Sequence, residues 1–279
     1  MSMIPIINRF TCTRRQLPMM INTIQNKNMN VILDYSNENK VQHKRNFHEI
    51  MDLIQHYPNH HIAIKLSSLN IQNKDMAETY LEDITKRALQ NNCKLLIDAE
   101  NYEIQEDIYD TTDKFIKQYN KNEVNIYKTY QLYRNDSMNV LKYDMFCDRD
   151  YFLGFKLVRG AYYNEDKVHN ILFDTIEETH ANYDEGIELF FKQSKPQDKL
   201  LCATHNEDSI LKTIHMLKIH NTKNVSFAQL LGMSDQLSRQ LSKEHRIYKY
   251  LPYGDFQDTL PYLIRRLYEN YPMLLNIFK

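Results

Sequence analysis

Glycine is scarce in this 279-residue chain, which contains only five glycines. They are Gly154, Gly160, Gly186, Gly232 and Gly254, and none of them belongs to a GxGxxG or GxxxxGK[ST] pattern. Both patterns supply glycine where a tight loop must wrap around a nucleotide phosphate. Their absence excludes a Rossmann or Walker loop, so any dinucleotide would have to bind by another arrangement.

Cysteine and metal-ligand patterns are also sparse. The four cysteines are scattered and no two have CxxC spacing, which favours reduced thiols in an intracellular compartment. Neighbouring histidines, such as His60 with His61 or His215 with His220, lack HxH and HExxH spacing. The sequence therefore gives no support for a metallohydrolase, and we expect no metal site.

Neither sign of charge dominates, and no long apolar run is present. The 35 lysines and arginines are balanced by 36 aspartates and glutamates, which predicts neither nucleic acid nor an anionic membrane as a partner. No apolar run approaches the length of a membrane span, and the N-terminus lacks the apolar stretch of a secretory signal. We expect a soluble protein that acts on a small molecule and has no integral membrane segment.

The N-terminal segment is basic. Four basic residues and no acidic residue precede Asp34, and such a start is also typical of an organellar transit peptide. Strand-like sequence begins by Val31, behind a short leading helix, which leaves little room for a removable peptide. We therefore favour a cytoplasmic over a mitochondrial location.

Eight short β-rich runs recur along the chain, each followed by a longer stretch that can be helical. The runs are 31–35, 62–66, 94–99, 124–130, 152–158, 200–204, 225–230 and 246–251. This alternation is typical of βαβ units around a parallel sheet. Because no linker divides the chain, we predict an α/β fold in which 1–279 form one closed (β/α)₈ barrel domain, with 1–30 as a helical lead-in. The longest gap, between the fifth and sixth runs, would hold an extra loop or helix.

Polar residues end all eight predicted strands. In barrels of this kind the chemistry takes place at the carboxyl ends of the strands. A strand emerging into solvent would explain any one polar end, but eight together favour a functional site at one mouth. A buried lysine on one strand beside an aspartate on the next would form a charge-assisted pair there.

A helix predicted near the C-terminus carries a polar stripe. Tyr262, Arg265, Arg266 and Glu269 have the spacing i, i+3, i+4, i+7, which places them on one face. Two adjacent guanidiniums suit a carboxylate or a phosphate. The alternative is a solvated face on which Arg265 and Glu269 form an ion pair.

Several motifs in sequence order resemble the proline dehydrogenase family. They are Lys65, Asp98, KLVRGAY at 156–162, THN at 204–206, QLLGM at 229–233, YLPYG at 250–254 and YLIRRLYEN at 262–270. The resemblance covers 33–270 and is closest to the monofunctional enzymes of eukaryotic type. It implies an FAD-dependent (β/α)₈ barrel that oxidises L-proline to 1-pyrroline-5-carboxylate, the first step of proline catabolism, with the last helix over the barrel mouth.

The resemblance also implies a role for each matching residue in substrate binding and catalysis. Arg265 and Arg266 would bind the proline carboxylate, and Lys65 would contact the same substrate while pairing with Asp98. The residues expected to wall the proline ring are Tyr162, Tyr250 and Tyr262. The Tyr250 hydroxyl would fill the space of a 4-hydroxyl and so favour proline over hydroxyproline. The expected catalytic residues are Lys65, Asp98, Lys156 and Tyr162.

For FAD, the resemblance implies contacts along the whole cofactor. Ala99 and Lys128 would lie near the isoalloxazine and Lys156 near its reactive nitrogen. The phosphates would be bound by Arg159, Gly160 and Ala161, and the ribityl and pyrophosphate portion by Thr204 and His205. Lys128 stands where glutamine or asparagine is usual, and Lys156 where bacterial members often carry arginine. A cation at Lys128 would favour the anionic reduced ring and shift its potential, unless the side chain points elsewhere.

Two other functions stay open at this point, as does the electron acceptor. A Schiff-base aldolase could use Lys65 or Lys156 as an amine nucleophile. A non-catalytic descendant could keep the barrel and the anion clamp as a binding module. For the enzyme, we expect a quinone or another carrier to accept the electrons.

Overall fold

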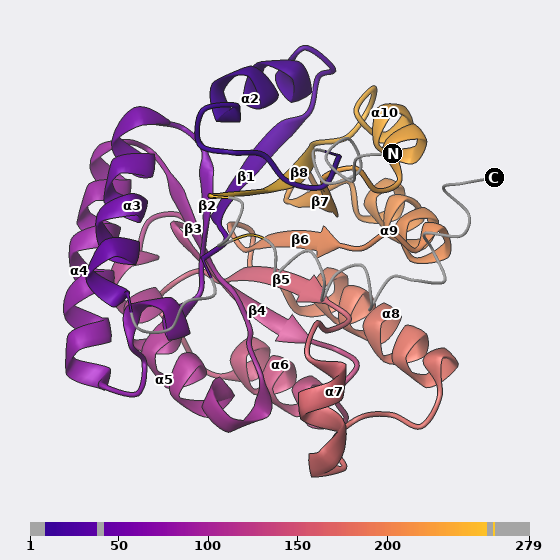
Figure 1. The fold of residues 1–279 in the computed structure, drawn as a ribbon. Helices are drawn as coiled ribbons and strands as arrows, with labels where there is room; N and C mark the ends of the chain where they lie inside the picture. The colour runs from indigo at the N-terminus through magenta and orange to yellow at the C-terminus, as the bar shows by residue number, and fades with distance from the viewer. Residues whose placement is uncertain (1–8, 38–41, 256–258, 260–279) are drawn as a thin grey trace.

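Eight parallel strands close into a barrel in chain order, and β8 pairs with β1 to complete it (Figure 1). The computed structural model describes residues 9–37, 42–255 and 259. The strands are β1 (Asn30–Tyr35), β2 (His61–Ile64), β3 (Lys94–Ile97), β4 (Ile126–Gln131), β5 (Gly154–Val158), β6 (Lys199–Ala203), β7 (Val225–Leu230) and β8 (Ile247–Tyr253). The predicted (β/α)₈ barrel is confirmed, and each strand bound lies within two residues of the expected one.

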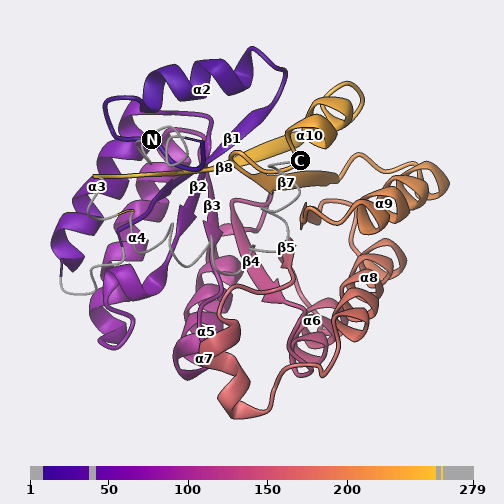
Figure 2. The ribbon, with the colours of Figure 1, turned by 45° about the vertical axis from the view of Figure 1, so that its right-hand side comes forward.

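Helices surround the strands on the outside of the barrel (Figures 1 and 2). They are α3 (His43–His56), α4 (Lys74–Gln90), α5 (Tyr102–Tyr119), α6 (Ser137–Phe146), α8 (Ile176–Gln193), α9 (Glu207–His220) and α10 (Asp235–Leu241). α3 illustrates the pattern, because Ile50, Leu53 and Ile54 repeat at helical spacing and are buried. α8 begins with a capping box between Thr175 and Glu178, a device that stabilises a helix by about 1 kcal/mol.

Four further elements complete the described fold. η1 (Leu66–Leu69) follows β2, and α7 (Tyr163–Asp166) with η2 (Lys167–His169) follows β5. The latter pair confirms the extra structure predicted between the fifth and sixth strands. α2 (Leu17–Gln25) packs beside β1 in both views, so a helix does precede the first strand as predicted.

Alternate strand residues face opposite sides of the barrel wall, as the two-residue period of a strand requires. One set fills the barrel interior and includes Ile32, Leu96, Tyr127, Leu201 and Tyr248. The other set packs between the wall and the helices, and Tyr130 and Phe155 belong to it. This alternation decides which polar residues at the strand ends can reach the mouth.

Candidate active site at the barrel mouth

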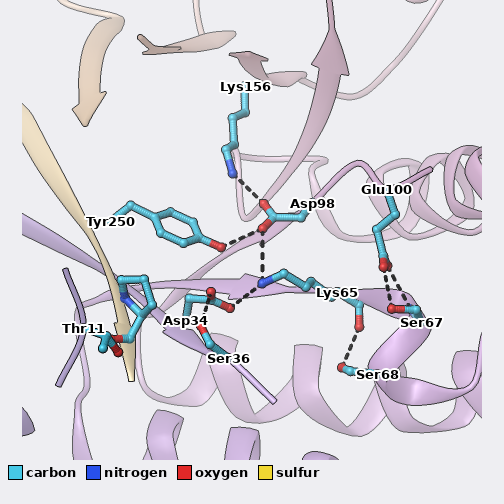
Figure 3. Close-up of polar contacts among 11 residues, drawn as sticks. Thr11, Asp34, Ser36, Lys65, Ser67, Ser68, Asp98, Glu100, Lys156 and Tyr250 are labelled. Atoms are coloured by element: carbon cyan, nitrogen blue, oxygen red, sulfur yellow. Dashed lines mark hydrogen bonds and ion pairs between the residues drawn. The ribbon is translucent and has the colours of Figure 1, made fainter. Parts of the chain in front are cut away.

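Five charged or polar side chains from five neighbouring parts of the barrel wall meet inside the barrel mouth, from within or directly after β1, β2, β3, β5 and β8 (Figure 3). Asp98 is central: its Oδ1 accepts a hydrogen bond from Lys156 Nζ at 2.5 Å, and its Oδ2 accepts one from Tyr250 Oη at 2.7 Å. Lys65 Nζ lies 4.0 Å from Asp98 Oδ2 and donates to Asp34 Oδ1 at 2.8 Å. We call these residues, Asp34, Lys65, Asp98, Lys156 and Tyr250, the mouth network.

The mouth network is buried, and its charges stabilise one another. Asp98 is 8% exposed and Lys156 is 5% exposed. Burial raises the pKa of Asp98, but attraction to Lys156 and Lys65, with hydrogen bonds from Lys156 and Tyr250, outweighs it and holds the pKa below its usual value. Burial lowers the pKa of Lys65, but attraction to Asp34 and Asp98 raises it overall. At neutral pH, Asp98 is therefore a carboxylate and Lys65 an ammonium.

Asp34 is a partner to which the sequence analysis gave no role. The expected Lys65–Asp98 pair is present at 4.0 Å, yet the shorter bond of Lys65 goes to Asp34. Asp34 is 1% exposed, and its Oδ2 also accepts a hydrogen bond from Ser36 Oγ at 2.7 Å. Its position at the end of β1, next to β2 in the closed barrel, was the signal that could have assigned it.

Lys128 lies on the outer side of the barrel wall, away from the mouth network. Its Nζ is 2.7 Å from Asp113 Oδ1 of α5 and 2.8 Å from Asp144 Oδ2 of α6, and it lies over the Tyr109 ring. Because Tyr127 faces the interior, the next residue must face the helices. The structure therefore contradicts the expected position of Lys128 beside a flavin.

Gln131 is the last inward-facing residue of β4, and it received no role in the sequence analysis. Its Nε2 donates to the carbonyl oxygen of Glu100 at 2.8 Å, and its Oε1 accepts a hydrogen bond from Ala161 N at 3.3 Å. The amide thus joins the ends of β3 and β5 at the mouth. Counting the period of two along β4 would have selected Gln131 in place of Lys128.

Glu100 is a second buried carboxyl group at the end of β3. It accepts hydrogen bonds from Ser67 N, at 2.9 Å, and from Ser67 Oγ (Figure 3). Burial raises the pKa of Glu100 above its usual value, although the bonds from Ser67 and the charge of Lys65 oppose the shift. Glu100 therefore ties η1 to the barrel end, next to the mouth network.

Arg159 organises a second polar cluster at the ends of β5 and β6. It donates to Thr204 Oγ1 at 2.6 Å, to Ser209 Oγ at 3.0 Å and to His180 Nδ1 at 3.0 Å. Its guanidinium carbon lies 4.4 Å from the centroid of the Tyr183 ring. Burial lowers the pKa of Arg159, and no carboxylate of residues 9–37, 42–255 or 259 lies within 4.0 Å of it. A cation with only neutral partners is suited to bind an anion.

The remaining expected residues surround these two groups. A Cβ on Gly160 would lie 2.2 Å from the Tyr133 ring, so the approach of this loop to Tyr133 requires glycine. His205 Nε2 accepts a hydrogen bond from Leu230 N at 3.4 Å. Tyr162 lies close enough to Lys65 to help raise the pKa of that lysine. Ala99 directly follows Asp98 and is buried.

Three expected substrate-binding residues, Tyr262, Arg265 and Arg266, lie outside the described residues. The same holds for the rest of the helix expected over the mouth. The structure thus brings Lys65, Asp98, Lys156 and Tyr250 together, with Tyr162 close to Lys65. It groups Arg159 with Thr204 and separates Lys128 from both groups.

Comparison with known proteins gives consistent matches. A family model described as proline dehydrogenase matches residues 19–274. "Proline dehydrogenase 1, mitochondrial" of Dictyostelium discoideum is 37% identical over 209 residues, which cover 68% of this chain and 36% of that protein. "Hydroxyproline dehydrogenase" of Xenopus laevis is 35% identical over 217 residues, which cover 71% of this chain and 46% of that protein. The chain therefore spans about a third to a half of the length of these relatives.

A solved structure with the same fold is proline utilization A from Bdellovibrio bacteriovorus, inactivated by N-propargylglycine. The match has a TM-score of 0.87 at 16% identity and covers 96% of this chain and 33% of that one. At this identity the match supports the barrel fold alone.

The relatives correct one sequence-based expectation. We favoured a cytoplasmic over a mitochondrial location, but the relatives from Dictyostelium discoideum, Caenorhabditis elegans and Homo sapiens are all named as mitochondrial proteins, which contradicts that preference. Within the described residues, no helix has both the length and the apolar character needed to cross a bilayer.

Proposed function

The chain belongs to the proline dehydrogenase family, and on this basis we propose that it oxidises L-proline to 1-pyrroline-5-carboxylate with FAD as cofactor, the first step of proline catabolism. The observation that carries the proposal is the mouth network, because it places fixed ammonium and carboxylate groups where a barrel enzyme binds its substrate. The electrons are proposed to leave through a quinone or another carrier.

Proline enters as a zwitterion, so the site must hold a carboxylate and tolerate a positively charged ring nitrogen. Lys65 is kept protonated by Asp34 and Asp98, so it can offer a permanent positive charge to the substrate carboxylate. Arg265 and Arg266 are proposed to complete the carboxylate site, since adjacent guanidiniums offer the matching fork of donors.

Oxidation requires that the ring nitrogen lose its proton and that a hydride leave the neighbouring carbon. FAD, when bound, supplies the acceptor for that hydride. The protein must hold the ring in one orientation and exclude water. Tyr162 and Tyr250 are proposed as two walls for the ring, and the hydrogen bond from Tyr250 to Asp98 fixes the orientation of the second wall. Asp98 likewise fixes Lys156 Nζ, so the cation does not have to reorganise during the reaction.

The residues of the Arg159 cluster fit the anionic part of FAD. Arg159 is a half-buried cation whose hydrogen bonds all go to neutral groups, and a pyrophosphate would supply the missing negative charge. Residues proposed to hold the cofactor are Ala99, Lys156, Arg159, Gly160, Ala161, Thr204 and His205. Lys128 is not among them, because its ion pairs lie on the outer side of the wall.

A Schiff-base aldolase is less consistent with the electrostatics of the mouth. An amine nucleophile needs a lowered pKa, whereas the pKa of Lys65 is raised by its two carboxylate neighbours. Lys156 Nζ donates a hydrogen bond to Asp98 Oδ1, which directs this nitrogen at the carboxylate and away from a carbonyl substrate.

The test is a flavin absorbance spectrum of the purified protein before and after anaerobic addition of L-proline. A yellow protein that is bleached by proline is the expected result. A colourless protein that takes up no FAD would instead support a binding module and overturn the proposal. Bleaching by trans-4-hydroxyproline but not by proline would overturn the assigned substrate. A covalent adduct after borohydride treatment with a carbonyl substrate would favour the aldolase.

A further inference from the structure

A cavity of about 280 Å³ opens at the amino ends of the barrel strands. Its apolar base includes Tyr127, Leu201 and Tyr248 of the barrel interior. Lys94 lines it at the start of β3, whereas Asp98 lies four residues further on, roughly 13 Å away at the rise of a strand. The cavity is therefore separate from the mouth network and lies at the opposite end of the barrel.

The cavity has an excess of positive charge. Its lining contains four cations, Lys94, Lys199, Lys223 and Arg246, but only one carboxylate, Glu123. Lys94 Nζ pairs with Glu123 Oε2 at 2.9 Å and donates to Asn125 Oδ1 at 2.8 Å. The other three cations have no carboxylate within 4.0 Å in the part of the chain that the structure describes.

Burial and the excess of positive charge together lower the pKa values of Lys199 and His61. The pKa of Lys199 is lowered by burial and by repulsion from Arg246 and Lys94, although Glu123 opposes the shift. Lys199 Nζ donates to the neutral Asn224 Oδ1 at 2.7 Å. Burial, followed by the charges of Lys94 and Arg246 and of His60, lowers the pKa of His61 to about 3, so its imidazole is neutral at pH 7.

A purely structural role does not account for this arrangement. The amino-terminal face of a barrel usually serves stability, and stability favours pairing of a half-buried charge such as Lys199, whereas Lys223 and Arg246 are exposed parts of the lining. A fully buried cation on this side of β5 is paired, because Arg149 forms an ion pair with Asp198. Cations left facing a hollow space with an aromatic base are instead typical of a ligand site.

We infer that this cavity is a second binding site, for a small organic anion that carries two or more negative charges on phosphate or carboxylate groups. Arg246 offers a planar fork that matches either group, and Lys199 and Lys223 add point charges. The volume lies at the lower end of the range for ligand pockets, which excludes a large ligand. The inference does not depend on the proposed oxidation of proline.

The test is calorimetric titration of the full chain with inorganic pyrophosphate and, separately, with citrate, at constant ionic strength set with chloride. We expect saturable binding of at least one probe that persists in Arg159→Met, a substitution that removes the other cluster suited to an anion. Binding of pyrophosphate alone would assign the site to phosphate compounds, and binding of citrate alone to carboxylates. No saturable heat with either probe would overturn the inference.

Variants provide the residue-level test. Lys199→Met and Arg246→Met should each weaken binding at least tenfold, whereas Lys44→Met, an exposed lysine at the start of α3, should not change it. Glu123→Gln removes the single carboxylate from an exposed position and should tighten binding. The affinity of Glu123→Gln can be measured even if Lys199→Met fails to fold. Unchanged affinity in Lys199→Met, Arg246→Met and Glu123→Gln would contradict the assigned site.

Discussion

Replacing Asp98 with asparagine removes one negative charge from the mouth network and keeps the shape of the side chain. In the wild-type protein the carboxylate bonds Lys156 Nζ at 2.5 Å and Tyr250 Oη at 2.7 Å, and attracts Lys65 at 4.0 Å. The amide would leave Lys156 as a buried cation without a negative partner among the described residues, whereas Lys65 would retain Asp34. The perturbation therefore falls mainly on one ammonium group.

Breaking a buried ion pair by removing one partner typically costs about 3–5 kcal/mol. For a chain of this size, that loss corresponds to a fall in melting temperature of roughly 6–20 °C. The loss must depend on pH, because the pKa of Asp98 is lowered in the folded state. Its contribution to stability is present above the unfolded pKa of about 4 and disappears as the pH falls through the folded value.

The assay is urea unfolding of wild type and Asp98→Asn at pH 7 and at acidic pH, together with kcat/KM for proline. The matched control is Asp113→Asn, because Asp113 pairs with Lys128 on the outer side of the wall and Lys128 keeps Asp144. We expect Asp98→Asn to lose both stability and kcat/KM, and Asp113→Asn to keep its kcat/KM. If Asp98→Asn were as stable as wild type at pH 7, or if the stability difference failed to shrink in acid, our account of the mouth network would be refuted.

Three further predictions concern the edges of the site. Arg159→Met should weaken FAD binding roughly 10- to 150-fold, measured by flavin fluorescence, because a hydrogen bond to a charged group contributes about 1.5–3 kcal/mol. Arg265→Ala and Arg266→Ala should each raise the KM for proline strongly, since loss of a buried charge-assisted contact costs ~2–5 kcal/mol. An unchanged KM in both variants would exclude these arginines as the carboxylate site. Glu100→Gln should gain stability relative to wild type as the pH rises from about 4 to 8. The pKa of Glu100 is raised in the folded protein, so its carboxyl group stabilises the fold below the unfolded pKa. That contribution is lost as the pH rises through the pKa of the folded state. Urea midpoints across this range would check it, and parallel curves would contradict it.

The strands were predictable because β-rich runs alternate with longer helical segments, and that signal is local in sequence. The direction of a side chain at a strand end is harder to predict, since an error of one residue in the strand register places that side chain on the opposite face. Lys128 illustrates the error: the family resemblance assigned it to a position where glutamine or asparagine is usual, but its side chain lies outside the barrel, while Gln131 faces the mouth. Because Tyr127 faces the barrel interior, the inward-facing residues of β4 are those an even number of positions from it, which include Gln131 and not Lys128.

The partner of each charged side chain could not be predicted from its spacing along the sequence. Asp34 and Lys65 are 31 residues apart, and only the pairing of β1 with β2 joins them. The cations of the amino-terminal cavity are separated even more widely along the chain, since Lys94 begins β3 and Arg246 directly precedes β8. Barrel closure therefore gathers the strand starts at one end of the barrel, as it gathers the strand ends at the mouth.

The two ends of the barrel differ in how their charges are balanced. At the mouth, two ammonium groups, Lys65 and Lys156, face two carboxylates, Asp34 and Asp98, so this network carries no net positive charge, and Lys65 must share its charge between these carboxylates and the substrate. A proline zwitterion brings no net charge, but its carboxylate still needs local positive charge beyond that of Lys65. If Arg265 and Arg266 of the last predicted helix supply that charge, carboxylate binding depends on that helix. Lys65 and Lys156 meanwhile stay fixed by their carboxylate partners. At the amino end the cations outnumber the carboxylates, so an anion could bind there without any additional segment.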